Sequence, residues 1–378
     1  MQSLLPSSVA RNPNSHTYAE ILAALQAVSG SRRFSFRYEL LDSTGKVVGQ
    51  LDNVVSASIE ENWLADIKRK AKFVLRETGG IDFLSDRIKP HVRLHLSPFG
   101  VNDYVEWPQG VFLLVSAGRN IDARGRVTRE VEAYDLLQIF SDDLVTDRYA
   151  VAAGVNVVTA VTTLLGTVDK VVATNTTNLA VAKEWPPGTS KLKIINELLG
   201  MINYNTLSFN EDGQAVVSAY LSPTSRPAEY EYATDAAGLI VPNVDQELDV
   251  FRIPNKWVLV VSDPDRAPII GTYTNTDPSS PTSTVRRQRT IVDFRTEQDA
   301  TDATILAAKA ARLAFEASQV YEAIDFYTGM VPHHSGNDVI SLRYDPLAIN
   351  AKYSHQSWSM ELKAGAKMKH RARRVVGV

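Results

Sequence analysis

The chain has 378 residues, a formal net charge of −3 and no cysteine. This length exceeds what one hydrophobic core usually serves, so we expect roughly two to four domains. The lack of cysteine excludes disulfides, thiolate metal sites and cysteine nucleophiles, and the small net charge gives no reason to expect nucleic acid to be drawn to the whole surface. No apolar run approaches the roughly 20 residues of a membrane helix, so we expect no stable membrane insertion. No secretory signal is apparent, so we expect the protein to be synthesised in a cytoplasm.

Residues 1–32 are polar apart from one amphipathic stretch, residues 18–28, which we expect to be a docking arm or a first helix. From Phe34 onward the pattern has a period of two, and turns separate a series of short segments of this kind. The segments are residues 34–40, 47–51, 54–60, 70–76, 92–97, 104–107, 111–117 and 127–133. Because no long helix interrupts them, residues 33–140 favour an antiparallel barrel or sandwich. Asp135, which precedes an apolar run, has the character of a helix N-cap.

Residues 141–244 mix helical and strand patterns, which predicts a small α+β domain. A helix is expected over residues 153–165, and a second begins near Ser190, whose hydroxyl can accept a free backbone amide. A hairpin follows, in which Gly213 supplies the positive φ that a tight turn needs. Residues 222–247 are rich in Pro, Ser, Asp and Glu and are expected to form an exposed connection.

Residues 245–378 form the last predicted domain, again of barrel type. Its polar stretch, residues 272–284, has a composition that favours a surface loop, and residues 297–321 have the alanine-rich pattern of a helix. Strands are expected over residues 256–262, 323–327, 338–344 and 353–362.

A basic run ends the chain. Its cationic side chains are Lys367, Lys369, Arg371, Arg373 and Arg374. One interpretation is a solvated strand end or tail, and the other is an electrostatic contact with an acidic neighbouring subunit.

Candidate chemical groups are few. His333 and His334 are adjacent, so on a strand they would face opposite ways, and no third ligand follows at zinc-like spacing. We therefore expect them to be loop residues and assign no metal ligand. The acidic pairs Glu60-Glu61 and Asp142-Asp143 are the kind that chance supplies among 43 acidic residues. We assign no catalytic residue and no cofactor, and we do not expect an enzyme.

The order of several weak motifs resembles the baseplate or tail-tip hub family of tailed phages, which includes the tail-associated (Tal-type) proteins. The motifs are the Gly-Val-Phe strand at residues 110–112, the Ala-x-Asp strand end at residues 133–135, the helix and hairpin of residues 185–223, the Asn-x-x-Val-x-Val strand from Asn255, and a Gly-Asn-Asp-Val strand from Gly336. The inserted Asn337 and Trp257 depart from the family pattern. The resemblance covers roughly residues 35–370.

The resemblance implies a β-rich α+β chain with two small antiparallel β-barrel domains, at residues 33–140 and 245–378, that flank an α+β insertion and assemble as a homotrimeric ring. It implies a structural virion protein that is assembled in the host cytoplasm and closes the distal end of the tail tube. Its implied partners are the distal tail protein ring, the tape-measure protein and a fibre or spike, with DNA only as passing cargo. Two alternatives stay open, which are the hub of a phage-derived contractile injection system and a wall-degrading tail enzyme.

Overall fold

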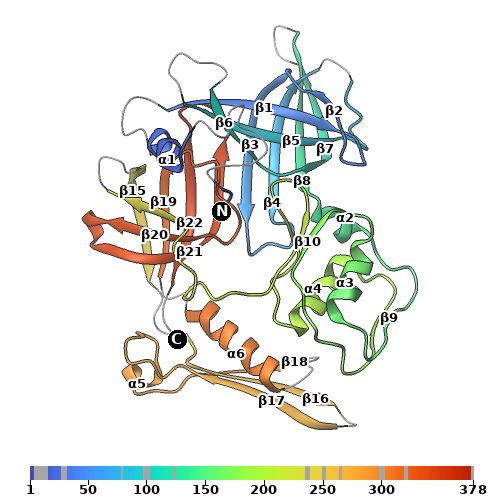
Figure 1. Cartoon of the computed structure of the whole chain (residues 1–378), viewed down its shortest axis with the longest axis vertical. Helices are drawn as coiled ribbons and strands as arrows, with labels where there is room; N and C mark the ends of the chain where they lie inside the picture. Colours follow the sequence, from blue (N-terminus) through green and yellow to red (C-terminus); the bar gives the residue numbers. More distant parts are fainter. Residues whose placement is uncertain are drawn as a thin grey trace.

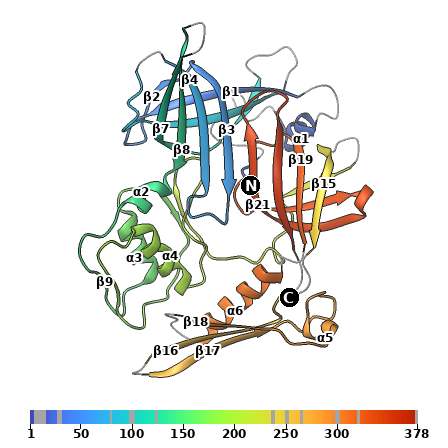
Figure 2. The same cartoon turned by 180° about the vertical axis from the view of Figure 1, so that it is seen from behind.

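The computed structural model describes residues 1–3, 16–26, 32–77, 80–96, 103–121, 125–234, 239–248, 253–263, 266–297, 303–318 and 322–375. The expected positions Val28 and Ser97 lie outside this part. The described chain consists of one large sheet, an α+β unit beside one end of it, and a small separate layer of three strands and a helix (Figures 1 and 2).

Fourteen strands form the large sheet. In spatial order its main path is β15 (Ile240–Leu248), β19 (Glu322–Gly329), β22 (Lys367–Arg374), β21 (Ile349–Glu361), β3 (Val54–Asn62), β4 (Arg69–Arg76), β8 (Val127–Asp135), β7 (Phe112–Ile121), β5 (Arg87–His95), β1 (Arg33–Leu41) and β2 (Val47–Gln50). Three strands pair off this path: β6 (Tyr104–Pro108) with β5, β20 (Val339–Tyr344) with β21, and β14 (Tyr230–Ala233) with β20.

The sheet contains the same four-strand arrangement twice. In β3-β4-β8-β7 and in β15-β19-β22-β21, the strands lie side by side in the chain order first, second, fourth, third. In each set the third strand carries a bulge, between Leu114 and Ser116 in β7 and between His355 and Ser357 in β21. In each set a further strand, β5 or β20, pairs with the first part of that third strand. We call these sets the first half and the second half of the sheet.

The two halves join edge to edge, because β21 pairs with β3 from Ser357↔Asn62 to Glu361↔Ser58. The expectation of two separate closed barrels is therefore not met: the path of described strands runs from β15 to β2 without closing on itself. The physical reason is the bulge in β21, since the strand pairs with β20 before it and with β3 after it. One strand thus serves both halves.

One hydrophobic core lies under both halves. It includes Phe73 and Phe112 from the first half and Phe326 and Tyr353 from the second, all fully buried. Helix α1 (Tyr18–Gln26) adds Ile21 and Leu25, so the amphipathic stretch near the start of the chain is a packed helix rather than a free arm.

The α+β unit follows β8 and has its own core. Its helices are α2 (Leu137–Asp142), α3 (Val157–Leu165) and α4 (Lys191–Met201), and its short strands are β9 (Tyr149–Val151), β10 (Lys170–Val172), β11 (Lys183–Trp185), β12 (Ser208–Phe209) and β13 (Ala215–Val217). As expected, Ser190 caps α4, with its hydroxyl accepting the Lys193 amide at 3.2 Å. Gly213 adopts a φ of +85°, and a Cβ there would lie 2.7 Å from the Val111 side chain, so the turn requires glycine.

A third layer lies below the other two in Figures 1 and 2 and contacts the α+β unit through Arg312, which donates to the Tyr204 carbonyl at 2.8 Å. Strands β16 (Lys256–Asp263), β17 (Arg266–Thr274) and β18 (Val292–Glu297) are covered on one face by α6 (Ala303–Ser318). The short helix α5 (Thr284–Arg287) lies between β17 and β18, and a 3₁₀ turn (Asp345–Leu347) follows β20. A Cβ on Gly271 would lie 2.5 Å from the Leu306 backbone, so glycine is what lets α6 pack so closely on β17.

The structure modifies two expectations about polar segments. Residues 222–247 contain β14 and part of β15 rather than only an exposed connection, and Tyr232 in β14 is buried. Residues 272–274 of the predicted surface loop belong to β17, and the rest is a loop with exposed residues such as Thr276, Pro278 and Ser279 around a buried polar centre of Asn275, Ser280 and Thr282. Their polarity is satisfied locally: Asn275 Nδ2 donates to Ser280 Oγ at 2.9 Å and to Thr282 Oγ1 at 3.3 Å.

Candidate functional site

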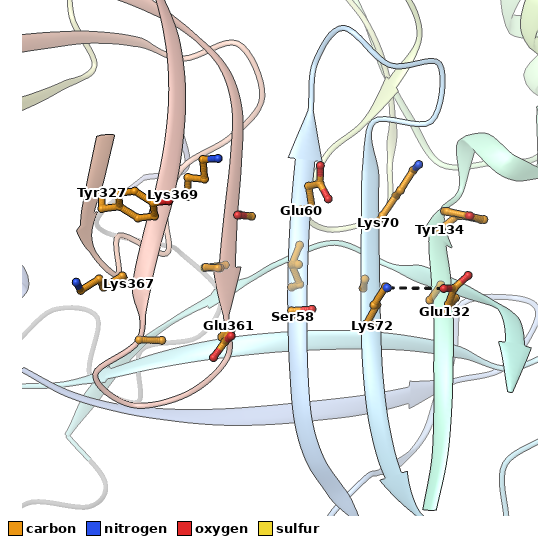
Figure 3. A pocket seen from close by; sticks show the side chains of 16 residues that line it. Ser58, Glu60, Lys70, Lys72, Glu132, Tyr134, Tyr327, Glu361, Lys367 and Lys369 are labelled. Atoms are coloured by element: carbon orange, nitrogen blue, oxygen red, sulfur yellow. Dashed lines mark ion pairs between the residues drawn. The ribbon is translucent and has the colours of Figure 1, made fainter. Parts of the chain in front are cut away.

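A trough of charged side chains crosses the junction of the two halves. It lies on the face of β8, β4, β3, β21, β22 and β19 that is opposite the hydrophobic core, and it has a volume of about 640 Å³ (Figure 3). The two faces of the sheet differ because successive side chains along each strand point to opposite sides. Ile59, Ala71 and Met360 point into the core, while their neighbours in the chain point into the trough.

Register arranges the trough residues in rows across the strands. One row runs from Tyr134 through Lys70, Glu60 and Ser359 to Lys369, and β19 continues it with Tyr327. The next row runs through Glu132, Lys72, Ser58 and Glu361. Neighbours along a row are close enough for cross-strand interaction.

Acidic and basic side chains alternate within these rows. Lys72 Nζ lies 3.8 Å from Glu132 Oε1, the ion pair drawn in Figure 3. The acidic members are Glu60, Glu132 and Glu361, and the basic ones are Lys70, Lys72, Lys367 and Lys369. Because their side chains are exposed and mixed in sign, the surface is strongly hydrated and nearly balanced in charge. Such a surface offers polar molecules a path without a strong binding site.

The predicted basic run is a strand of the sheet, so of the two forms considered for it, a strand end or a tail, the structure shows a strand. Strand β22 pairs with β19 on one side and β21 on the other. Only Lys367 and Lys369 line the trough. Arg371 lies 3.0 Å from Asp325, and Arg374 donates to buried Glu322 at 2.6 Å. Arg373 instead lines a smaller hollow beside α6, where burial lowers its pKa.

The acidic pairs considered as catalysts are not brought together. Glu60 faces the trough, whereas Glu61 is buried on the other face, where burial raises its pKa to about 7 although Arg69 lies 3.1 Å away. Asp143 bonds Lys191 at 2.6 Å, and Asp142 accepts from Gln138.

A buried ionic link fixes the α+β unit against the sheet. Arg69 in β4 donates to Glu61 in β3 and to Glu211 in the β12–β13 turn. Asp135 supports the same region, because it accepts the amides of Arg69 and of Leu137, the first residue of α2, each at 3.0 Å. Burial raises the pKa of Asp135 to about 6. Asp135 was expected to be the N-cap itself, but it lies one residue before the N-cap, Leu136, and its contact with β4 was not predicted.

The histidines of residues 333–334 lie in a buried loop between β19 and β20, as expected for loop residues. The argument that no third ligand is available does not hold, however. His334, His355 and His370 come together from this loop, β21 and β22, with one nitrogen from each within 4.8 Å of the others. Sequence spacing could not reveal this cluster, because strand pairing creates it.

Comparison with known proteins places this fold among phage tail proteins. The chain is similar to the tail protein from Neisseria meningitidis MC58, with 14% identity, a TM-score of 0.64 and coverage of 90% of this chain and 96% of that one. It is also similar to the 43 kDa tail protein of prophage MuSo2 from Shewanella oneidensis (10% identity, TM-score 0.58, 89% and 98% covered). The prophage tail protein gp18 from Listeria monocytogenes EGD-e gives 12% identity and a TM-score of 0.54, with 89% and 94% covered.

The expected resemblance to phage tail proteins is thus confirmed at the level of the fold. No protein-family model matches the sequence, and no curated protein matches it either. Among the described residues, no helix combines the length and the apolar character needed to cross a membrane.

Proposed function

We propose that this protein is a structural hub at the tip of a phage tail, where three copies form a ring that closes the distal end of the tail tube. The observation that carries the proposal is the repeated four-strand order of the two halves. Since every pairing between β15 and β7 is antiparallel, β3 and β15 run in the same direction. The two halves are therefore related by a rotation that keeps the direction of the strands. Repeating such a rotation generates a ring.

The free edges of the sheet have the right form for this assembly. In the β21–β3 junction, the part of β21 after its bulge pairs with the first strand of the other half. The matching part of β7, residues 116–121, pairs only with β8 among the described strands. On the opposite edge, β15 pairs with β19 and with no other strand that the structure describes. We infer that β7 of one copy pairs with β15 of the next, as β21 pairs with β3 within one chain.

Three copies joined in this way would form a ring of six similar four-strand units. The exact symmetry of this ring would be three-fold. The trough would line the bore of the ring, because the other face of the sheet carries the hydrophobic core. Its mixed charge suits a channel through which DNA passes without being retained. The expected neighbours remain the distal tail protein ring, the tape-measure protein and a fibre or spike, and the basic side chains of β22 stay candidates for subunit contact. The protein would then act as a structural component of the virion rather than as an enzyme.

The test is the mass of the purified protein in solution and its image by negative-stain microscopy. We expect a trimer with a central opening. Two variants of the exposed edge strand, Gln246→Pro and Glu247→Pro, test the proposed junction. Adjacent residues of an edge strand direct their amides alternately inward and outward, so only one of the two prolines removes an inward hydrogen bond.

The proline at the outward position should keep the melting temperature of the wild type but abolish the trimer, and the inward one should lower the melting temperature. A wild-type protein that stays monomeric at high concentration, and is absent as a ring from images of assembled tails, would refute the proposal. A trimer that survives both prolines would refute the β7–β15 junction alone.

A further inference from the structure

The second half of the sheet contains a closed group of imidazoles that the tail-tip role does not use. His334, His355 and His370 are each no more than 2% exposed. The rings of His334 and His355 lie 4.9 Å apart between centroids, and those of His355 and His370 lie 5.0 Å apart. A neutral imidazole keeps one lone pair, which can bind a ligand.

Hydrogen bonds around the cluster fix which nitrogen carries the proton. Asp338 Oδ2 lies 2.8 Å from His334 Nδ1 and also accepts the Ser335 amide, so His334 Nδ1 is the protonated nitrogen and Nε2 holds the lone pair. The other oxygen of Asp338 lies 2.5 Å from the α-ammonium of Met1, which balances its charge.

The same reasoning applies to His370. The hydroxyl of Thr328 donates to the Gly329 carbonyl, so it must accept from His370 Nε2, which lies 2.7 Å away. His370 Nδ1 is then unprotonated and accepts the proton on His355 Nε2, which lies 3.0 Å away, so without a metal ion His355 is protonated on Nε2. In metal centres, a ligating histidine typically donates its second nitrogen to a neighbouring acceptor in this way.

The backbone explains why these residues meet. The bulge of β21 after His355 keeps both His355 and Trp358 on the buried side of the sheet, where His370 also points from β22. The Tyr232 hydroxyl from β14 bonds His334 Nε2 at 2.6 Å and adds an oxygen to the group. Four separate segments thus contribute donor atoms to one buried point.

We propose that His334 Nε2, His355 Nε2 and His370 Nδ1 bind a divalent transition metal ion of the zinc type, with the Tyr232 oxygen as the fourth donor. Three neutral imidazoles and one oxygen suit Zn²⁺, which prefers four-coordinate tetrahedral sites with metal–nitrogen distances of about 2.0–2.1 Å. Nitrogens around such an ion lie roughly 3.4 Å apart. The cluster has one pair of nitrogens at 3.0 Å and all three within 4.8 Å, so small side-chain movements bring the nitrogens to this spacing. To bind the ion, the His355 proton moves from Nε2 to Nδ1, and the Tyr232 hydroxyl gives up its hydrogen bond to His334 Nε2.

The site is structural rather than catalytic, since its ligands have no exposure to a substrate. Its ligands come from β14, the β19–β20 loop, β21 and β22, so the ion would hold together the part of the second half next to the junction. A buried ion of this kind enters during folding, and its binding energy contributes to folding.

The test is to refold the full-length chain from denaturant with and without Co²⁺, and separately with Zn²⁺. We expect about one ion per chain by elemental mass spectrometry, an intense visible absorption band typical of tetrahedral Co²⁺, and a higher melting temperature with Zn²⁺ than after refolding in chelator. His355→Gln and His370→Gln should lose the band. Thr328→Val, which removes the acceptor for His370, should weaken Co²⁺ binding about 10–100-fold.

His333→Gln is the matched control. His333 is the neighbour of His334 in the same loop and is equally buried, but it lies outside the cluster. This variant should keep the wild-type band. A wild-type chain that refolds with excess Co²⁺, shows no tetrahedral band and retains no metal would refute the site and leave only a network of neutral imidazoles. Equal loss of the band in His333→Gln would refute the assignment of ligands.

Discussion

The two halves of the sheet share a strand order but differ in the polar groups that stabilise them. Beside the first half, the strands β1, β5 and β6 that extend it hold an ionic cluster in which fully buried Glu106 accepts from Arg37 and Arg93 and lies 3.2 Å from His91. In the corresponding region of the second half, the buried group consists of uncharged imidazoles, a phenol and one carboxylate. The repeated backbone therefore fixes the arrangement of strands, while each half satisfies its buried polar groups by different chemistry.

The largest effect is expected for Glu106→Gln. This change removes the carboxylate that Arg37, Arg93 and His91 share in a largely buried place. Arg37 and His91 are left with Glu39 alone, and Arg93 loses its ion pair, so the free energy of unfolding should fall by about 3 kcal/mol. Chemical denaturation followed by circular dichroism measures it. Glu132→Gln, at an exposed ion pair, is the control and should change the free energy by less than about 1 kcal/mol. Equal effects of the two changes would contradict the ionic account of the first half.

Acid should affect the first half through the same cluster. The hydrogen bond from His91, together with Arg37, lowers the pKa of Glu39 to about 2. For Glu106, burial would raise the pKa, but hydrogen bonds from His91, Arg37 and Arg93 outweigh it and keep the pKa well below its usual range. Because both values are lower in the folded state, their stabilisation is complete above about pH 5 and is lost as the pH falls toward 2. Melting temperatures across this range should fall more steeply for the wild type than for a Glu39→Gln variant. Parallel curves would count against the cluster.

A smaller effect is expected for Tyr353→Phe in the second half. The Tyr353 hydroxyl donates to buried Glu322, but this carboxylate also accepts from Arg374 at 2.6 Å and so keeps a partner. The loss should be about 1 kcal/mol, the value of one ordinary hydrogen bond. Denaturation under the conditions used for Glu106→Gln allows direct comparison. A loss as large as that of Glu106→Gln would remove the proposed difference between the halves.

The smallest effect on stability is expected in the trough, which both halves form. The combined change Glu60→Lys, Glu132→Lys and Glu361→Lys alters only outward-facing side chains, so unfolding should shift by little more than about 1 kcal/mol. Yet the trough becomes uniformly basic, and salt-dependent binding of short duplex DNA should appear in a fluorescence anisotropy assay.

A control variant carries the same net charge outside the trough, at the exposed positions Asp52→Lys, Asp147→Lys and Glu231→Lys. It should bind DNA more weakly. Equal binding by the two variants would mean that overall charge, rather than the trough, governs the contact.

Local features of the fold were predictable from the sequence, whereas contacts between distant segments were not. The capping hydroxyl of Ser190 and the turn glycine Gly213 act as their positions predict. Strand β22 was not predicted as a paired strand because the exposed Lys and Arg side chains obscure the buried residues Met368, His370 and Ala372 that alternate with them. The trough and the histidine cluster both depend on β21, which pairs with β20 before its bulge and with β3 after it. No local sequence pattern reveals these partners.

The β3–β21 junction has a consequence for synthesis of the protein. Residues 357–361 leave the ribosome long after residues 58–62, so the growing chain must carry an open strand edge at β3 for most of its translation. Open edges of this kind recruit other strands and promote aggregation. We therefore expect the nascent chain to depend on holding factors until its last strands emerge, and truncation before residue 349 to yield insoluble protein.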